Sequence, residues 1–335
     1  MEEIRKVAVI GTGTMGNGIA LWFAKAGLGV SLRDVDQEFL DRARKTQDET
    51  LKALSAAGAV AEGEEEAIRG RIRGTTDLAE ALEGVDFVLE AVPEALELKR
   101  SVFAELEMVA PPGIPLASNT SGISISLIAE GVRDPSRVVG MHWWNPPHVV
   151  RVIEVIRGRK SSDAVVETTR ALVERIGKKP VMVKKDVPGF LGNRILYALL
   201  RETMYCYEQG VADAEDIDLL VSEAFALKLA FMGPMALLDL AGLDVYHDVS
   251  RYLNAELCDS KGVSPTVAGR VAKSELGLKT KKGFYDYSDV DIPALWPILK
   301  RRGYLILPIV VMIYVLIQGY TPARAALWAI IWLMG

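Results

Sequence analysis

The chain has 335 residues, half of them hydrophobic, which is enough to bury a large core and to form two domains. Its net charge of -5 argues against a nucleic-acid-binding protein, because such proteins concentrate Lys and Arg on one face. The two cysteines, Cys206 and Cys258, belong to no metal-binding motif, so we expect no metal site and a reducing compartment. No apolar stretch follows a basic start at the N-terminus, so we expect no secretory signal and a cytoplasmic protein.

The first part of the chain alternates between strand and helix patterns. Residues 6–27 contain a short apolar strand, a glycine-rich turn and a helix, and residues 29–36 form a second strand that ends in an acid. Residues 37–57 have the apolar periodicity of a long helix, and an acidic turn leads into another helical stretch through Arg71. We expect these two helices to form a hairpin inserted into the α/β unit.

Four further strand candidates follow, and a helix over Leu96–Val109 separates the first two. They fall within residues 85–94, 114–124, 137–146 and 149–156. Strands that alternate with helices imply a parallel, doubly wound sheet of the Rossmann type.

The later part of the chain is almost entirely helical in pattern. Residues 189–275 show this pattern, with breaks at Gly210, Gly233-Pro234 and Gly242. We therefore place a domain boundary near Val187 and Pro188. The predicted organisation is a nucleotide-binding domain over residues 1–187, a helical domain over residues 188–288 and an apolar tail over residues 289–335.

Gly11, Gly13 and Gly16 form a G-x-G-x-x-G motif between the first strand and its helix. The first glycine permits a tight turn, the second lets the backbone approach a pyrophosphate, and the third allows close packing of the helix on the sheet. This context predicts a dinucleotide site. Thr14 and Met15, at the start of the helix, are expected at the same site.

Asp34 ends the next strand, where an acid can bind the adenosine ribose of a dinucleotide. A carboxylate at this place would repel a 2′-phosphate, so the sequence favours NAD over NADP. The neighbouring Arg33 is the residue that leaves NADP open as the alternative.

A histidine and an acid lie twelve residues apart in two neighbouring strand candidates. His142 precedes Asn145 and two prolines, and Glu154 interrupts the apolar run of the next strand. A buried carboxylate is costly without a partner, but in adjacent strands Glu154 can accept a hydrogen bond from one imidazole nitrogen of His142. The other nitrogen is then free to take a proton from an alcohol whose carbon loses a hydride. The pattern predicts a dehydrogenase dyad.

Six motifs occur in the order found in the 3-hydroxyacyl-CoA dehydrogenases, which the chain resembles over about residues 4–287. They are GxGxxG, ASNTSGIS, MHWWNPP followed by VIEVI, DVPGFLGNR, GPMALLDLAGLDV and KTKKGFYDY. The resemblance implies NAD-dependent oxidation of the 3-hydroxyl of a 3-hydroxyacyl-CoA to the 3-oxoacyl-CoA, as in fatty acid β-oxidation. It also implies that the helical domain contributes to the substrate site and forms a homodimer.

The resemblance assigns site residues position by position. His142 corresponds to the catalytic base and Glu154 to its orienting partner. Ser121 corresponds to a serine that contacts the substrate oxygen, and Asn193 to an asparagine that helps to hold the reacting group. Both of these residues also suit the start of a helix, which is the structural alternative. The remaining positions are expected near the cofactor (Glu94, Lys99 and Asn119) and near the substrate (Asn145).

Two alternatives to this function stay open. The later part of the helical hairpin reads LKALSAAGAVAEGEEE, with Lys52 as its only base, so it offers little positive charge to a CoA phosphate. A free 3-hydroxy acid, such as carnitine or gulonate, is therefore an alternative substrate, as in relatives of the same superfamily. A non-catalytic, NAD-binding structural protein is the second alternative, and the full set of site residues argues against it.

The apolar tail departs from the dehydrogenase pattern. Residues 303–319 carry no charge, approach the length that spans a bilayer and follow Lys300-Arg301-Arg302, which would keep the enzyme on the cytoplasmic side. The tail resembles a fragment of the large membrane subunit of a TRAP-type carboxylate transporter. A fused membrane anchor, a chimeric or truncated gene product, and a soluble or dimer-covering helix are the alternatives. A transporter component would require a longer membrane domain.

Overall fold

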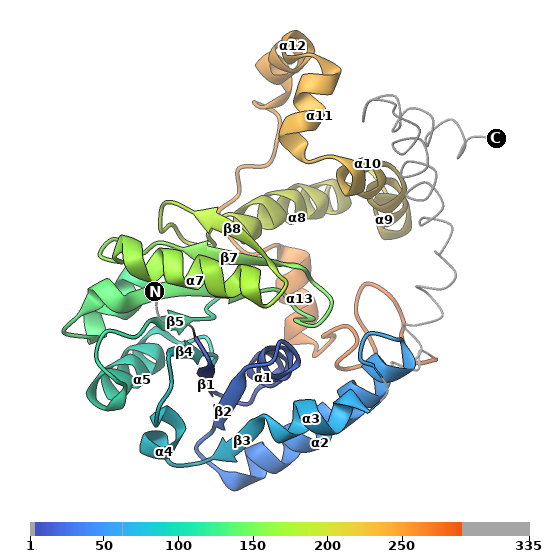
Figure 1. Ribbon diagram of the computed structural model, residues 1–335. Coiled ribbons are helices and arrows are strands. Elements are labelled where there is room, and N and C mark those ends of the chain that lie inside the picture. The colour runs from blue at the N-terminus through green and yellow to red at the C-terminus, as the bar shows by residue number, and fades with distance from the viewer. Residues whose placement is uncertain (1–3, 62, 290–335) are drawn as a thin grey trace, which may run out of the picture. The chain divides into compact units, whose positions relative to one another are not determined.

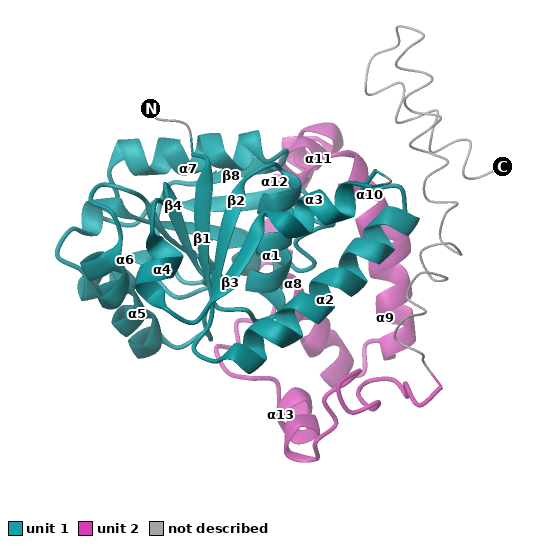
Figure 2. Ribbon diagram, turned by 60° about the horizontal axis from the view of Figure 1, so that its bottom comes forward, with its two compact units in different colours: residues 1–196 teal, residues 197–335 magenta. Residues whose placement is uncertain are grey.

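An eight-stranded sheet lies at the centre of the first half of the protein in the computed structural model, which describes residues 4–61 and 63–289 (Figure 1). The strand order is β3-β2-β1-β4-β5-β6-β7-β8. The chain divides into two compact units, residues 1–196 and 197–335 (Figure 2), and the predicted boundary near Val187 and Pro188 stays a prediction. The strands are β1 (Lys6–Ile10), β2 (Gly29–Arg33), β3 (Ile72–Thr75), β4 (Phe87–Glu90), β5 (Leu116–Ser118), β6 (Val138–Trp143), β7 (Val152–Ile156) and β8 (Lys179–Val183).

Helices cover both faces of this sheet, as a doubly wound fold requires (Figure 1). They are α1 (Thr14–Lys25), α2 (Gln37–Ala56), α3 (Glu64–Gly70), α4 (Leu78–Leu82), α5 (Leu96–Val109), α6 (Ile125–Ile128) and α7 (Asp163–Arg175), with short 3-10 turns at Ala129–Gly131 and Pro135–Arg137.

Each face of the sheet has its own hydrophobic core. In β1, Val7 and Val9 join the core that contains side chains of α1, α2, α3 and α7. Ala8 and Ile10 join the core that contains side chains of α4, α5 and α6. The alternation follows from the two-residue period of a strand, so the apolar run of β1 is buried on both sides.

The strand directions correct the prediction of a wholly parallel sheet. Strands β1 to β6 pair in parallel, but β6 and β7 are antiparallel, and β8 is parallel to β7. The connection from Trp144 to Arg151 is too short for a parallel crossover, which needs about a dozen residues or more. The chain therefore returns as a hairpin, and this reversal places Glu154 opposite His142.

The outer strands β3 and β8 were not predicted from the sequence. Both lie at the edges of the sheet and are partly exposed, with Arg73 in β3 and Lys179 and Pro180 in β8. An edge strand tolerates charges and proline because one of its sides has no neighbouring strand. These two sequences therefore lack the continuous apolar run that identified the central strands.

The helical character predicted after residue 189 is confirmed. The helices are α8 (Gly192–Glu208), α9 (Ala214–Leu220), a π-helical turn (Val221–Phe225), α10 (Ala226–Phe231), α11 (Pro234–Ala241), α12 (Leu243–Leu253) and α13 (Pro265–Ala272). The predicted breaks coincide with helix ends: Gly210 and Gly242 have positive φ angles, and Pro234 occupies the first turn of α11. Within the second unit, the Tyr285 hydroxyl donates to Asp218 Oδ2 at 2.7 Å.

In the described part of the chain, no individual helix combines the length and apolar character of a membrane span. One bent pair, Ala214–Phe231 with Pro234–Ala241, passes the same test only when the two are taken together. The predicted membrane segment at residues 303–319, with the rest of the chain after residue 289, lies outside the described residues.

Candidate active site

The glycine-rich turn between β1 and α1 has two glycines that the fold needs and one that it does not. Gly11 has a φ of +104°, and a Cβ atom there would lie 2.7 Å from the Ala91 carbonyl oxygen. A Cβ atom on Gly16 would overlap the carbonyl oxygen of Gly11. A Cβ atom on Gly13, in contrast, would meet nothing within 4 Å. Gly13 therefore leaves open space at the helix start, which is where a pyrophosphate would lie.

The N-terminus of α1 is suited to an anion. Gly13 is its N-cap and contributes no side-chain hydrogen bond, and the first turn contains no acid. The amides of Thr14 and Met15 thus belong to a first turn whose N–H groups receive no side-chain cap. These features suit an anion such as a pyrophosphate, and the contacts of Thr14 and Met15 with the cofactor stay a prediction.

Asp34 lies at the carboxyl end of β2, beside the glycine-rich turn. Its Oδ2 atom accepts hydrogen bonds from the amide and the hydroxyl of Thr12, at 2.7 and 2.6 Å, and its Oδ1 atom accepts one from the Val35 amide. The neighbouring Arg33 directs its Nε atom to the Thr76 carbonyl oxygen at 3.4 Å. The carboxylate is therefore fixed beside the turn, where the ribose of a dinucleotide would reach it.

His142 and Glu154 form the buried pair that the sequence predicted. They are directly opposite each other in the antiparallel β6–β7 register, and His142 Nδ1 lies 2.7 Å from Glu154 Oε2. Both side chains are only 4% exposed. The His142 ring also packs against the rings of Trp144 and Phe190, at centroid distances of 5.0 and 6.0 Å.

Glu154 is a carboxylate in this position, because hydrogen bonds from His142 and from two backbone amides compensate the cost of its burial. Its Oε1 atom accepts hydrogen bonds from the amides of Leu191 and Gly192, at the start of α8. Burial alone would raise the pKa of Glu154, but the bond with His142 and these two amides outweigh burial and lower the pKa below its ordinary value. A carboxylate therefore faces Nδ1, which leaves Nε2 as the nitrogen available for proton transfer.

The loop after β5 brings Ser121 and Asn193 together. The Asn193 side-chain amide donates to the Ser121 carbonyl oxygen at 2.7 Å, and Ser121 itself is exposed. Asn119, two residues earlier, is buried, and its Oδ1 atom accepts from the Trp143 amide at 2.8 Å. Asn119 thus ties the loop to the residue that follows His142. The predicted roles of these residues toward substrate and cofactor stay predictions.

Glu94 accepts hydrogen bonds from the same loop. Its Oε1 atom accepts from the Thr120 hydroxyl at 2.6 Å and from the Ser121 amide at 2.9 Å, and its Oε2 atom lies 3.4 Å from Lys99 Nζ. Burial would raise the pKa of Glu94, but the Thr120 hydroxyl, the Lys99 charge and the Ser121 amide lower it below the ordinary value. Glu94 is half-exposed, so one side of it can still reach a ligand.

Lys99 is buried, and the residue that binds it was missed in the sequence. Its ammonium lies 2.7 Å from Oε1 of Glu90, a fully buried acid at the end of β4. Glu90 also accepts from the Ser118 hydroxyl at 2.6 Å and from the Val92 amide at 2.7 Å. An acid inside the apolar run FVLE is the same signal that identified Glu154, and it predicts a buried partner in the same way.

Asn145 is exposed in the loop after β6, and its peptide bond to Pro146 is cis. The structure records no side-chain contact of Asn145 with the other predicted site residues among those it describes, so its role at the substrate stays a prediction.

The predicted residues in the first unit gather at one edge of the sheet. The glycine-rich turn follows β1, Asp34 follows β2, Glu94 follows β4, Asn119 follows β5, and His142 lies near the end of β6. Because these five strands are parallel, their carboxyl ends meet at this edge, where open α/β sheets bind ligands.

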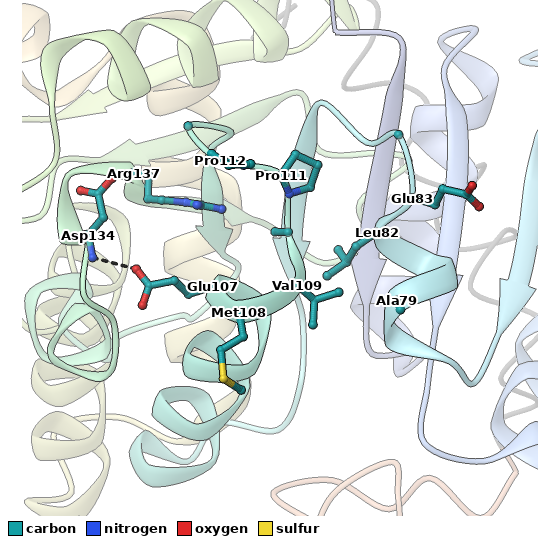
Figure 3. Close-up of a pocket in the computed structure, with 13 residues that line it drawn as sticks. Ala79, Leu82, Glu83, Glu107, Met108, Val109, Pro111, Pro112, Asp134 and Arg137 are labelled. Atoms are coloured by element: carbon teal, nitrogen blue, oxygen red, sulfur yellow. Dashed lines mark hydrogen bonds between the residues drawn. The ribbon is translucent and has the colours of Figure 1, made fainter.

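A cavity of about 740 Å³ lies at the opposite edge and contains none of these residues (Figure 3). It is lined by Leu82 and Glu83 before β4, by Pro111 and Pro112 before β5, and by Arg137 before β6. Its place at the amino ends of the strands separates it from the candidate active site.

Comparison with known proteins identifies the family. Residues 6–187 match the family of 3-hydroxyacyl-CoA dehydrogenase NAD-binding domains, and residues 189–287 match the C-terminal domain of the same enzymes. A 5-formyl-3-hydroxy-2-methylpyridine 4-carboxylate 5-dehydrogenase of Mesorhizobium japonicum is 43% identical over 87% of this chain and 94% of its own length. A probable 3-hydroxybutyryl-CoA dehydrogenase of Bacillus subtilis is 38% identical over 86% of this chain and 99% of its own length.

Solved structures agree with these sequence relatives. The crystal structure of a 5-formyl-3-hydroxy-2-methylpyridine 4-carboxylic acid 5-dehydrogenase has a TM-score of 0.81 and 41% identity, over 91% of this chain and 97% of that one. The (S)-3-hydroxybutyryl-CoA dehydrogenase of Ralstonia eutropha has a TM-score of 0.71 and 34% identity, over 85% of this chain and all of that one. The chain therefore belongs to the 3-hydroxyacyl-CoA dehydrogenase family and is an NAD-dependent oxidoreductase.

Proposed function

We propose that the protein oxidises the 3-hydroxyl group of a 3-hydroxyacyl-CoA to the 3-oxoacyl-CoA, with His142 as the general base. The observation that carries this proposal is the buried hydrogen bond between His142 Nδ1 and Glu154 Oε2, which leaves Nε2 as the proton acceptor. When bound, NAD supplies the hydride acceptor. The hydroxyl proton goes to His142 Nε2, the hydride leaves C3, and the C–O single bond becomes a carbonyl.

Glu154 keeps the histidine in the productive tautomer. Its carboxylate accepts the Nδ1 proton and stabilises the imidazolium that forms when Nε2 takes the substrate proton. The amides of Leu191 and Gly192 hold the other carboxylate oxygen, so the acid cannot rotate away. Ser121 and Asn193, which are joined by a 2.7 Å hydrogen bond, are proposed to hold the substrate oxygen.

A free hydroxy acid, or another small carboxylate, is the second candidate substrate. The helical hairpin α2–α3 supports it, because the charges there partly neutralise one another: Arg69 Nε lies 2.7 Å from Asp48, and Arg42 lies 3.9 Å from Glu38. Three glutamates occupy the first turn of α3. A CoA phosphate that approached this turn of α3 would meet negative charge, whereas the exposed bases Arg44, Lys45 and Lys52 lie on α2. The relative of 43% identity is also named for a pyridine carboxylate and not for a thioester.

The deciding experiment is NAD reduction by the purified full-length protein with two sets of substrates. The first is (S)-3-hydroxybutyryl-CoA, and the second contains free 3-hydroxybutyrate, carnitine, gulonate and 5-formyl-3-hydroxy-2-methylpyridine 4-carboxylate. We expect the thioester to have the highest kcat/KM. A higher kcat/KM for a free acid would mean that this acid, and not an acyl-CoA, is the substrate. The role proposed for His142 would not change. Turnover of none, with NAD still bound, would support a non-catalytic structural protein.

We further propose that the protein is a cytoplasmic homodimer. The second unit leaves large apolar side chains exposed, among them Met235, Leu240 and Tyr246, at 74%, 64% and 50%. Such a surface is costly in water unless another protein surface covers it. Light scattering of the purified protein should give twice the mass of one chain, and a monomer at micromolar concentration would contradict the proposal.

A further inference from the structure

The loop Asn145–Val150 connects the catalytic strand β6 to β7 and lies against the dinucleotide-binding helix α1. Pro147 is buried, and a Cβ atom on Gly18 of α1 would lie only 2.6 Å from its Cγ atom. The amides of Val149 and Val150 both donate to the Pro146 carbonyl oxygen at 3.0 Å. The loop is thus a compact turn whose position depends on how Pro147 fits over Gly18.

A buried lysine fastens this loop from the other side. Lys178, between α7 and β8, is 4% exposed, and its ammonium donates to the carbonyl oxygens of Pro147 and Val150 at 2.7 Å each. The same Nζ atom lies 3.7 Å from the centre of the Trp22 ring, a close cation–π contact. Trp22 belongs to α1, and its indole donates to the Ile176 carbonyl oxygen at 3.0 Å. Lys178 therefore joins the loop to the helix that carries the G-x-G-x-x-G motif.

The electrostatic surroundings of Lys178 do not favour a stabilising role. Among the residues that the structure describes, no carboxylate forms an ion pair with it, and the charged groups that face it are Lys25 and Arg151, with His148 on the loop. Burial and these two positive charges lower the pKa of Lys178 to about 8. Burying a cation beside other cations opposes folding, and the two carbonyl oxygens and the Trp22 ring that the ammonium contacts offset this cost. The position of the loop therefore depends on a lysine that is costly to bury.

We propose that Lys178 is a positioning residue for the reaction, which holds the loop Asn145–Val150 on α1 and thereby fixes the end of β6 that carries His142. The loop begins one residue after Trp144, whose ring packs on the His142 ring. The neighbouring Trp143 is anchored by a 5.5 Å edge-to-face contact with Phe23 of α1. A shift of the loop would therefore change the distance between His142 and a cofactor bound at the start of α1.

The test compares Lys178→Met with Lys179→Met, which removes the adjacent, exposed lysine. Hydrogen–deuterium exchange of the peptide that contains Val149 and Val150 needs no substrate. We expect it to become at least about tenfold faster in Lys178→Met and to stay unchanged in Lys179→Met. We also expect kcat to fall by about tenfold or more while NAD affinity and Tm stay within error of the wild type, and Lys178→Arg to restore part of kcat.

Gly18→Ala provides a second variant, because it should displace Pro147 from the opposite side and produce the same faster exchange. This variant keeps the test valid if Lys178→Met fails to fold. Unchanged exchange of the loop in Lys178→Met would overturn the proposal. An equal loss of kcat in Lys178→Met and Lys179→Met would also overturn it. So would a lower kcat in Lys178→Met that comes with a lower Tm but without faster exchange of the loop. Because exchange is measured without substrate, an incorrect substrate assignment would leave this result interpretable.

Discussion

Glu154 lies directly across the antiparallel β6–β7 pair from His142, with 2.7 Å between Oε2 and Nδ1. The contact depends on the hairpin between the two strands, because a parallel arrangement of β7 would have given another register. A single turn in the backbone thus places a base and its orienting acid together. The two amides at the start of α8 then complete the hydrogen bonds of the acid.

Replacing His142 tests whether it is the base. We expect His142→Ala to lower kcat by about 10²- to 10⁴-fold, because no other group would accept the hydroxyl proton. NAD affinity, measured by calorimetry, should stay close to that of the wild type. Glu154→Gln should have a smaller effect on kcat, since the base remains but its tautomer is less well fixed. Near-normal turnover of His142→Ala would remove the dyad from the mechanism.

The lowered pKa of Glu154 predicts a pH dependence of stability. In the unfolded chain this group has a pKa of about 4.3, and in the folded protein its pKa is lower. The carboxylate therefore contributes stability that is fully present above about pH 4.3 and is lost as the pH falls through the folded pKa. Denaturant unfolding of the wild type and Glu154→Gln should show a free-energy difference that is constant near neutral pH and shrinks in acid. A difference that grows in acid would contradict the assigned direction.

The glycines of the turn between β1 and α1 provide a prediction with an internal control. Gly13→Ala adds a methyl group in open space, so the protein should fold normally but bind NAD at least about tenfold more weakly. Gly16→Ala places its Cβ atom on the Gly11 carbonyl oxygen and should lower Tm markedly. Calorimetric NAD titration and thermal unfolding of both variants separate the two effects. Unaltered NAD affinity in Gly13→Ala would show that the pyrophosphate does not approach this residue.

Site residues were easiest to predict from the sequence where a charged residue interrupts an apolar strand. Glu154 was identifiable because it interrupts an apolar strand, and the structure places it against His142 as expected. Glu90 has the same signature in β4, yet its partner Lys99 comes from a helix nine residues later, and helix periodicity alone did not show that it is buried. The contacts of Lys178 were not predictable, because they depend on the packing of Trp22, Pro147 and Gly18, which are distant from Lys178 in the sequence and carry no polar pattern.

Replacing Lys99 tests how much the buried ion pair with Glu90 contributes to the free energy of unfolding. Lys99→Met leaves the Glu90 carboxylate buried without its cation, which we expect to lower the free energy of unfolding by about 3–5 kcal/mol. The double variant Lys99→Met/Glu90→Gln should recover part of this loss, because a neutral amide is easier to bury. Urea unfolding of the single and double variants measures both values. A Lys99→Met protein as stable as the wild type would show that the buried ion pair contributes little to stability.

Lys178 predicts a second pH dependence of stability, at alkaline pH and with the same sign as that of Glu154. Its pKa is about 8 in the folded protein and 10.5 in its ordinary state, so between these values the unfolded chain binds the additional proton. Stability must then rise with pH over this window, by up to about 3 kcal/mol, relative to a variant without the amine. The difference in unfolding free energy between the wild type and Lys178→Met should therefore shift in favour of the wild type from about pH 8 to pH 10.5. Lys179→Met, which removes an exposed amine, should show no such shift. A flat difference for Lys178→Met would mean that the two carbonyl oxygens and the Trp22 ring fully compensate the burial of the charge.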